Sequence, residues 1–271
     1  MLLATGMVMR VLWQSFVDAT QNPSYLDGLS AYLNEIAAAG IQVEVRGMTP
    51  PDRDFGRLTE FRCAIGAVDN AIEAEQQGYD GFVMGHFQDA GLYEARSAVH
   101  IPVVGTGEAT LHLAAQLGRR IGLVSIDPIF AVWHHEQAER YGLANRVVAI
   151  AGLGATPEDF GAAFAGDQMA FARLRSAFID CATPLVEKGA DVIVPAGVLP
   201  GLLLARERGL KVGHAPVVNC AAVALKTAEM LIALYQTDGL EPSRGPSFAL
   251  APRRAIEDFR ALVARGPQLP P

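Results

Sequence analysis

Three apolar segments of this chain end in residues that recur later in the sequence at nearly one spacing, and this repeat constrains the fold more than any other feature. The run from Gly78 to Val83 matches the run from Gly189 to Val194, a shift of 111 residues from position 78 to position 189. The other two matches pair residues 10–15 with 120–125, and residues 102–104 with 216–218. One match could arise because parallel strands draw on the same few residue types. Three matches in register predict two related halves of about 110 residues each.

Short apolar runs alternate with longer amphipathic stretches, a pattern typical of strand–helix units that build a parallel sheet. We expect strands over residues 8–13, 42–46, 81–84, 102–104, 121–125, 147–150, 192–194 and 216–218. Helix boundaries are indicated by Ser24 as an N-cap and Gly40 as a stop, by Thr59 ahead of a helix that reaches Gly78, and by Thr156 before a proline. A last helix is expected over about residues 253–264. The predicted fold class is therefore α/β.

The composition excludes several classes of protein. The chain has 271 residues, 51% of them hydrophobic, which is enough for one large domain or two small ones. Its net charge of −7 and its scattered Lys and Arg residues argue against a nucleic-acid partner. No apolar run reaches the roughly 18 residues of a membrane span, and no secretory signal is recognisable at the start. Three cysteines without a CxxC pair indicate free thiols. We expect a cytoplasmic protein that acts on a small molecule.

The position of the site follows from the predicted sheets. Ligands of parallel sheets bind at the carboxyl ends of the strands, where loops and helix N-termini gather. Two related halves that face each other would enclose a cleft there, and the free N–H groups of helix N-termini suit a carboxylate or another small anion. The strand ends of the first half contribute Ser15, His86, Gly105 and Thr106, and those of the second half contribute Ser125, Gly197, Asn219 and Cys220.

Two stretches carry a resemblance to a known family, GHFQDAGLYEARSAVHIPVVGTGEATLHLAAQLGRRIGLVS and APVVNCAAVALKTAEML. They resemble the Asp/Glu/hydantoin racemase superfamily, most closely its hydantoin racemase branch, and the similarity covers roughly residues 8–236. The resemblance implies two pseudo-symmetric α/β lobes around a cleft, the first formed by residues 1–105 with 217–271 and the second by residues 106–216. It also implies a homo-oligomer and a cofactor-independent enzyme in which two cysteines, one from each half, act as opposed acid and base.

The chain departs from this family pattern at both catalytic positions. His86 stands at the place of the first cysteine, and Gly197 stands at the place of the second. Two-base racemisation needs a donor and an acceptor on opposite faces of one carbon, so a histidine facing a glycine provides one-sided proton transfer only. Imidazole titrates near pH 6.5 and serves in either direction. We interpret His86 as the acid/base residue. Asp89 either orients His86 or caps the helix expected to begin near Ala90.

The remaining expected site residues lie at or beside the strand ends. They are the substrate-binding candidates Gln14, Ser15, Asp18, Phe87, Gly105, Thr106, Glu108, Ser125, Asp127, Gly197, Val198, Asn219 and Cys220. Helix or turn capping is the alternative for the two aspartates, and the helix dipole alone would favour Glu108 in a first turn. No metal site is expected. Residues 134–136, two histidines and a glutamate, are interpreted as a solvated helix face, although His134 could approach the cleft.

Three functions remain open at this point. The first is a cofactor-independent enzyme of isomerase or decarboxylase type that acts on a small carboxylate or a cyclic ureide or imide through His86. The second is a hydrolase or lyase in which His86 activates water, either alone or with a metal shared by another cleft histidine such as His134 or His214. The third is a protein that binds a small acid without turnover.

Overall fold

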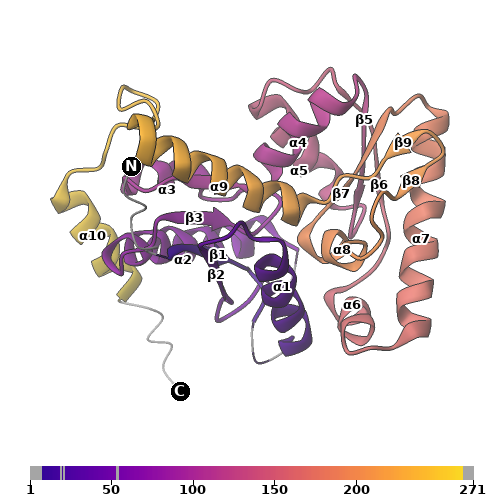
Figure 1. Cartoon of the computed structure of the whole chain (residues 1–271), viewed down its shortest axis with the longest axis horizontal. Helices are drawn as coiled ribbons and strands as arrows, with labels where there is room; N and C mark the ends of the chain where they lie inside the picture. The colour runs from indigo at the N-terminus through magenta and orange to yellow at the C-terminus, as the bar shows by residue number, and fades with distance from the viewer. Residues whose placement is uncertain (1–7, 19, 21, 53–54, 265–271) are drawn as a thin grey trace.

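Two parallel sheets form the framework of the computed structural model, which describes residues 8–18, 20, 22–52 and 55–264 (Figure 1). The first sheet has the order β2-β1-β3-β4, and the second has the order β6-β5-β7. Their strands are β1 (Met9–Gln14), β2 (Ile41–Arg46), β3 (Gly81–Met84), β4 (Val103–Gly105), β5 (Ile121–Ser125), β6 (Val147–Gly152) and β7 (Val192–Ala196). The α/β class with parallel sheets in two lobes is confirmed.

Helices connect the strands, as parallel pairing requires. They are α1 (Pro23–Ile36), α2 (Arg57–Gln76), α3 (Leu92–Ala98), α4 (Thr106–Leu117), α5 (Phe130–Arg140), α6 (Pro157–Phe164), α7 (Gln168–Glu187), α8 (Val198–Leu203), α9 (Cys220–Asp238) and α10 (Arg253–Ala264). In the part of the chain that the structure describes, none of them is both long and apolar enough to cross a membrane.

The sequence repeat reappears in the register of the two sheets. In the first sheet Gln14 pairs with Met84. In the second sheet Val124 pairs with Pro195. Val124 lies 110 positions after Gln14, and Pro195 lies 111 positions after Met84. The fourth strand follows the same rule, because Phe82 pairs with Val103 and the equivalent Ile193 forms a bridge with Val217. His86 and Gly197 therefore occupy equivalent places, since His86 lies two residues beyond Met84 and Gly197 lies two residues beyond Pro195.

The prediction of an eighth strand over residues 216–218 was wrong in its length. Only the single bridge at Val217 joins it to the second sheet, since Pro216 has no N–H to donate to a ladder and α9 begins at Cys220. A short antiparallel pair, β8 (Lys211–Val212) with β9 (Ala215–Pro216), was not expected.

Helix ends were predicted with mixed success. The N-cap of α1 is Asn22 rather than Ser24, because Pro23 occupies the first helical position, and the helix ends at Ile36, before Gly40. Likewise α2 starts at Arg57, ahead of Thr59. The start of α6 is confirmed, since Thr156 forms a capping box with Asp159. The bounds of α10 are confirmed as well.

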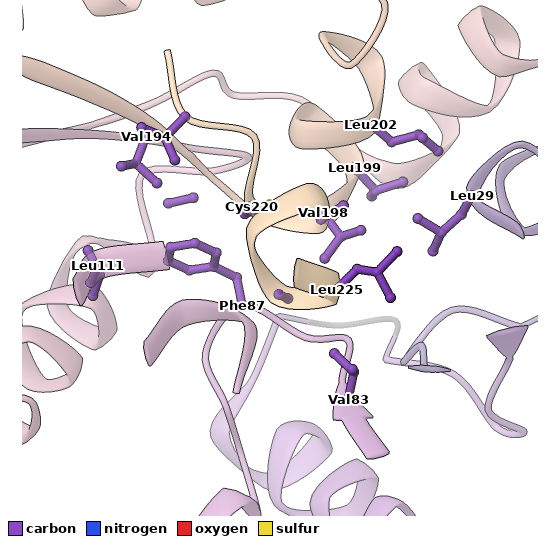
Figure 2. Close-up of a cluster of buried hydrophobic side chains, with 14 of the residues drawn as sticks. Leu29, Val83, Phe87, Leu111, Val194, Val198, Leu199, Leu202, Cys220 and Leu225 are labelled. Carbon is purple, nitrogen blue, oxygen red and sulfur yellow. The ribbon is translucent and has the colours of Figure 1, made fainter. Parts of the chain in front are cut away.

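One hydrophobic core spans both sheets. It includes Val83 of β3, Val194 of β7 and Leu225 of α9, each fully buried (Figure 2). Helix α9 leaves the second sheet and runs back toward the first, where its Ile232 packs on Gly81 (Figure 1). The proposed lobe boundaries at residues 105/106 and 216/217 stay a prediction, and residues 1–7 and 265–271 of the first lobe lie outside the described residues.

Candidate active site

A pocket of about 70 Å³ lies where β1, β3 and β7 end, with walls from both lobes. Most of its lining is apolar or aromatic: Phe16, Phe55, Ile126, Phe130, Val198 and Leu199. Its polar side chains are those of Ser15, Tyr25, Asp52, His86 and Gln88. The carboxyl ends of parallel strands, together with the apolar lining and a few convergent polar groups, are typical of a small-molecule site.

His86 lies in the wall of this pocket, two residues after β3. Its ring stacks on Phe16, with 4.3 Å between ring centroids and 10° between ring planes. Its Nε2 is 3.5 Å from Glu60 Oε1, and the two side chains are 16% and 14% exposed. The preceding Gly85 is required sterically, because a Cβ there would lie 2.1 Å from Trp13 Nε1. The site thus holds a largely buried imidazole between a phenyl ring and a carboxylate.

Gly197 lines the same pocket from the other lobe. A Cβ at this position would lie 3.2 Å from Pro200 Cδ and 3.5 Å from Ile126 Cγ1, a close but not obstructed fit. The nearby thiol of Cys220 donates to the Gly197 carbonyl oxygen at 3.3 Å, and burial raises its pKa to about 12. Cys220 is fully buried, does not line the pocket and keeps its proton, so it does not replace the absent cysteine.

Tyr25 brings a second polar group into the pocket from α1. Its hydroxyl shares a hydrogen bond with the side chain of Ser15, and burial raises the pKa of Tyr25 above its ordinary value. The Ser15 hydroxyl oxygen also accepts a hydrogen bond from Val17 N at 3.2 Å. Tyr25 therefore stays protonated. One of the two hydroxyls donates to the other, so the pair has one O–H hydrogen left for a ligand at the pocket wall.

Asp89 does not orient His86. Its carboxylate accepts hydrogen bonds from Gly107 N at 3.0 Å, Glu108 N at 2.7 Å and the Tyr141 hydroxyl at 2.6 Å. It thereby caps α4, and not the helix expected near Ala90, which begins as α3 at Leu92. The backbone of Asp89 is left-handed, with φ of 57°, a conformation that Asp tolerates better than most residues. Burial raises the pKa of Asp89 to about 6.

The interpretation of His134 as part of a solvated face was wrong, because its side chain is fully buried. Gln137 Nε2 donates to the Phe87 carbonyl at 2.5 Å, so Gln137 Oε1 faces His134 Nδ1, at 3.2 Å, as an acceptor. His134 Nε2 then accepts from the Ser125 hydroxyl at 3.1 Å. Burial lowers the pKa of His134 to about 4. We call Ser125, His134, Gln137, Asp89 and Tyr141 the interlobe network, since it ties α5 to the segment that follows His86.

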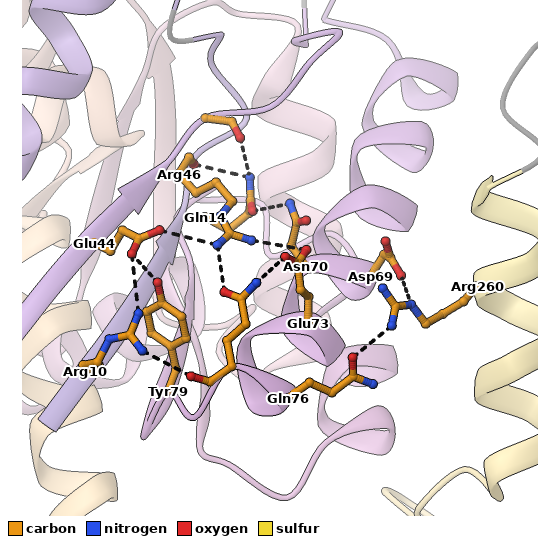
Figure 3. A network of polar contacts seen from close by, with 12 residues as sticks. Arg10, Gln14, Glu44, Arg46, Asp69, Asn70, Glu73, Gln76, Tyr79 and Arg260 are labelled. Atoms are coloured by element: carbon orange, nitrogen blue, oxygen red, sulfur yellow. Dashed lines mark hydrogen bonds and ion pairs between the residues drawn. The ribbon is translucent and has the colours of Figure 1, made fainter.

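Most other predicted substrate-binding residues lie outside the pocket lining, where they satisfy backbone groups or pair with each other. Gln14 is fully buried and donates to the Ser15 and Gly47 carbonyls. Asn70 donates to Gln14 (Figure 3). Thr106 donates to the Met84 carbonyl, and Gly105 packs against Leu92 and Asp89. Polar groups at strand ends mainly complete the fold here.

The charged and amide candidates are engaged in the same way. Asp18 accepts from Thr20 and Thr49, and Asp127 accepts from Ile129 N, so the capping alternative holds for both. Glu108 pairs with Arg96. Asn219 caps α9 and donates to the Tyr32 hydroxyl. Of the predicted site residues, the pocket brings together Ser15, His86, Phe87, Gly197 and Val198.

Sequence reasoning missed Phe16, Tyr25 and Glu60. Phe16 directly follows Ser15, so the same strand end pointed to it. Tyr25 shares the spacing of Leu29 and Leu33 on α1 and therefore looks like an ordinary core residue. Glu60 lies in the first turn of α2, where the helix dipole alone explains an acid.

No metal-ligand set emerges in the described part of the chain. None of its residues form a group of three or more His, Cys, Asp or Glu side chains that could hold an ion. Both ring nitrogens of His134 are engaged in the interlobe network. The His214 side chain is 66% exposed, beside Asp191 on the surface. The metal-dependent alternative thus lacks ligands around His86 among these residues.

The chain belongs to the Asp/Glu/Hydantoin racemase family, whose model matches residues 30–230. A hydantoin racemase of Paenarthrobacter aurescens is 28% identical over 198 residues, which are 71% of this chain and 79% of that protein. A hydantoin racemase of Pseudomonas sp. (strain NS671) is 31% identical over 91 residues, 34% of this chain and 36% of that protein, so this match spans only about a third of the relative. The resemblance inferred from the sequence is confirmed.

Solved structures share the fold. An allantoin racemase from Klebsiella pneumoniae superposes with a TM-score of 0.76 at 24% identity, covering 90% of this chain and 94% of that one. A glycine-to-cysteine mutant of arylmalonate decarboxylase gives a TM-score of 0.53 at 17% identity, covering 88% of this chain and 99% of that one. At these identities the likeness concerns the fold alone.

Proposed function

We propose that this protein is a cofactor-independent enzyme that moves a proton at a carbon next to a carbonyl group, with His86 as its acid/base residue. The observation that carries the proposal is the imidazole of His86 in the wall of the interlobe pocket, with Gly197, which has no side chain, at the equivalent place in the other lobe. Membership of a racemase family supports an isomerase-type reaction, and the absent thiols limit it to one face of the substrate.

The chemistry needs few groups. Neutral imidazole accepts the proton of the acidic C–H bond, and the bonding electron pair moves onto the carbonyl oxygen. The Tyr25–Ser15 pair donates its remaining O–H hydrogen to that oxygen as its charge develops. The imidazolium then returns a proton, either to the same carbon or to another atom on the same side. A positioned general acid/base contributes about 10²–10⁴-fold to such a reaction.

The lining of the pocket favours a cyclic ureide or imide over a free carboxylate. None of the described residues that line it is Lys or Arg, so they offer no fixed cation to a carboxylate. Ring N–H and C=O groups can instead meet hydroxyls and backbone groups, while Phe16, Phe55 and Phe130 suit an apolar substituent on the ring.

Substitution of His86 tests the proposal. We expect His86→Ala to lower the rate of proton exchange at the acidic carbon of 5-substituted hydantoins and related imides by about 10²-fold or more, because the proton acceptor is lost. The matched control is His135→Ala, which removes an exposed histidine on α5 and should leave the exchange rate unchanged. An unchanged exchange rate in the His86 variant would exclude the assignment. Tight binding without turnover by the wild type would favour the third alternative, a binding protein.

Decarboxylation is a second candidate, favoured by the same single-sided site. Loss of CO₂ from a substituted malonate breaks a C–C bond and leaves its electron pair on carbon, so only one proton donor is then needed. His86 in its protonated form would deliver that proton to one face. The expected readout is a product of one handedness, measured by chiral chromatography, and a racemic product would exclude this reaction at this site.

A further inference from the structure

We infer that Glu60 sets the tautomer of His86: it keeps the imidazole proton on Nε2 and leaves Nδ1 as the nitrogen that meets the substrate. The catalytic part of this inference rests on the proposed function. The tautomer itself is a property of the resting protein and does not depend on any substrate.

The geometry singles out one ring nitrogen. Nε2 of His86 is 3.5 Å from Glu60 Oε1, an ion-pair distance rather than a formed hydrogen bond. This nitrogen is shielded from solvent and accepts or donates no hydrogen bond within the described part of the chain. A substrate in the pocket does not reach this shielded nitrogen in the conformation seen here. The exposed 16% of the His86 side chain therefore belongs to its other atoms.

The stack on Phe16 limits the directions from which polar groups reach the ring. Phe16 covers one face in a near-parallel stack, so polar partners approach the imidazole mainly in its plane. One in-plane edge meets Glu60, and the other carries Nδ1. Since the ring lines the pocket, Nδ1 is the nitrogen left for chemistry there.

Electrostatics selects the proton position. A carboxylate beside the Nε2 lone pair repels it, whereas the same carboxylate attracts an Nε2–H group. Hydrogen bonds that orient catalytic groups are often long without substrate and tighten when it binds. Glu60 is thus a positioning residue. Asp89, expected from sequence to serve His86, is occupied by the amides of α4.

Nitrogen-15 NMR of the histidine side chains tests the inference directly. Spectra are recorded above about pH 8.5, where an ordinary imidazole is neutral, and His86 is assigned among the six histidines by its loss in His86→Asn. We expect Nε2 of His86 to resonate as a protonated nitrogen and Nδ1 as an unprotonated one. A predominantly Nδ1–H tautomer in the wild type would overturn the inference without any variant.

Glu60→Gln supplies the second arm. The amide can present its own N–H to Nε2, so the Nδ1–H tautomer should gain population, and kcat should fall about 10- to 100-fold with KM little changed. The control is Glu136→Gln, which removes an acid that pairs with Arg57, three residues before Glu60, without contact to His86. An unchanged tautomer in Glu60→Gln contradicts the role of Glu60.

The two proposals fail in distinguishable ways. Suppose that the wild type has the Nε2–H tautomer, that Glu60→Gln shifts it, and that His86→Ala keeps full activity. The inference about Glu60 would then hold, and the proposed function would be rejected. Loss of activity in His86→Ala with an Nδ1–H tautomer would do the reverse.

Discussion

The chemistry available to each side chain in this pocket depends on the residues that it contacts. His86 stacks on Phe16 and faces the carboxylate of Glu60. The absence of a side chain at Gly85 allows Trp13 of β1 to pack closely against the backbone just before His86. Tyr25 keeps its proton because it is buried, so it can donate but does not act as a base. Under the proposed function, His86 transfers the proton on one side and the Tyr25–Ser15 pair stabilises the charge that develops on the substrate.

Tyr25→Phe isolates the contribution of one hydroxyl. The change removes only an oxygen, so we expect the fold to persist while kcat falls about 10- to 100-fold, because one donor to the developing oxyanion is lost. Steady-state kinetics check this, with circular dichroism to verify folding. Tyr93→Phe is the control, since Tyr93 lies partly exposed on α3 and outside the pocket lining. Equal kcat for the two variants would exclude Tyr25 from catalysis.

At the scale of elements, the interlobe network couples α5 to the segment after β3. Asp89 and His134 lie in it with pKa values shifted by burial, to about 6 and about 4 respectively. The folded state therefore favours neutral forms of both groups. Their effects on stability have opposite signs between about pH 4 and pH 6.

The sign follows from proton binding. Asp89 has a raised pKa, so its stabilising contribution is complete below about pH 4 and is lost as the pH rises through about 6. His134 has a lowered pKa, so its contribution is present above about pH 6.5 and is lost as the pH falls through about 4. We therefore compare the free energies of unfolding of Asp89→Asn and the wild type. The value for the variant minus the value for the wild type should increase by up to about 3 kcal/mol as the pH rises from about 4 to about 6.

Urea unfolding at several pH values measures this difference. The opposite substitution, His134→Gln, should make the free energy of unfolding fall with rising pH over the same window, relative to the wild type. Parallel pH profiles for the wild type and both variants would contradict the account of the network.

Helix α6 offers a prediction on a single cap. Thr156→Ala removes the capping box with Asp159, and we expect the free energy of unfolding to fall by about 1 kcal/mol. Urea denaturation checks the value. Thr183→Ala on α7, whose exposed hydroxyl bonds to the Ile179 carbonyl, is the control and should have a smaller effect. Equal losses would mean that the cap adds nothing specific.

The elements also mark what the sequence can and cannot predict. Strands β3 and β5 agree with prediction to the residue, since apolar runs bounded by turn residues are local signals. His86 and Gly197 were found through the resemblance and the repeat. Glu60 and Tyr25 were not, because their arrival at the pocket depends on how α2 and α1 pack, which no local pattern encodes. His134 was misread because its burial depends on contacts with the other lobe.

At the scale of the molecule, the largest of three hydrophobic clusters among the described residues spans both lobes, and the pocket is lined by both. The core joins β3, β7 and α9, and the pocket takes its walls from residues before and after α4. The lobes should therefore unfold together. The homo-oligomer implied by the family resemblance stays a prediction.

The two tryptophans allow a test of this coupling. Trp13 lies in β1 of the first sheet, and Trp133 lies in α5, which follows β5 of the second sheet. Single-tryptophan variants, Trp133→Phe and Trp13→Phe, should each show one fluorescence transition in urea, with midpoints that coincide with circular dichroism of the same variant. Two separated transitions within one variant would mean that the lobes are independent.

The most direct measurement of the central claim compares proton exchange with racemisation in one sample. A single enantiomer of a 5-substituted hydantoin is incubated with the protein in D₂O, at a pH where the uncatalysed reaction is slow. Exchange is followed by NMR and handedness by circular dichroism. One-sided transfer by His86 predicts deuterium incorporation well ahead of racemisation, and loss of both in His86→Ala. Racemisation that keeps pace with exchange, or exchange that survives in His86→Ala, would contradict the account.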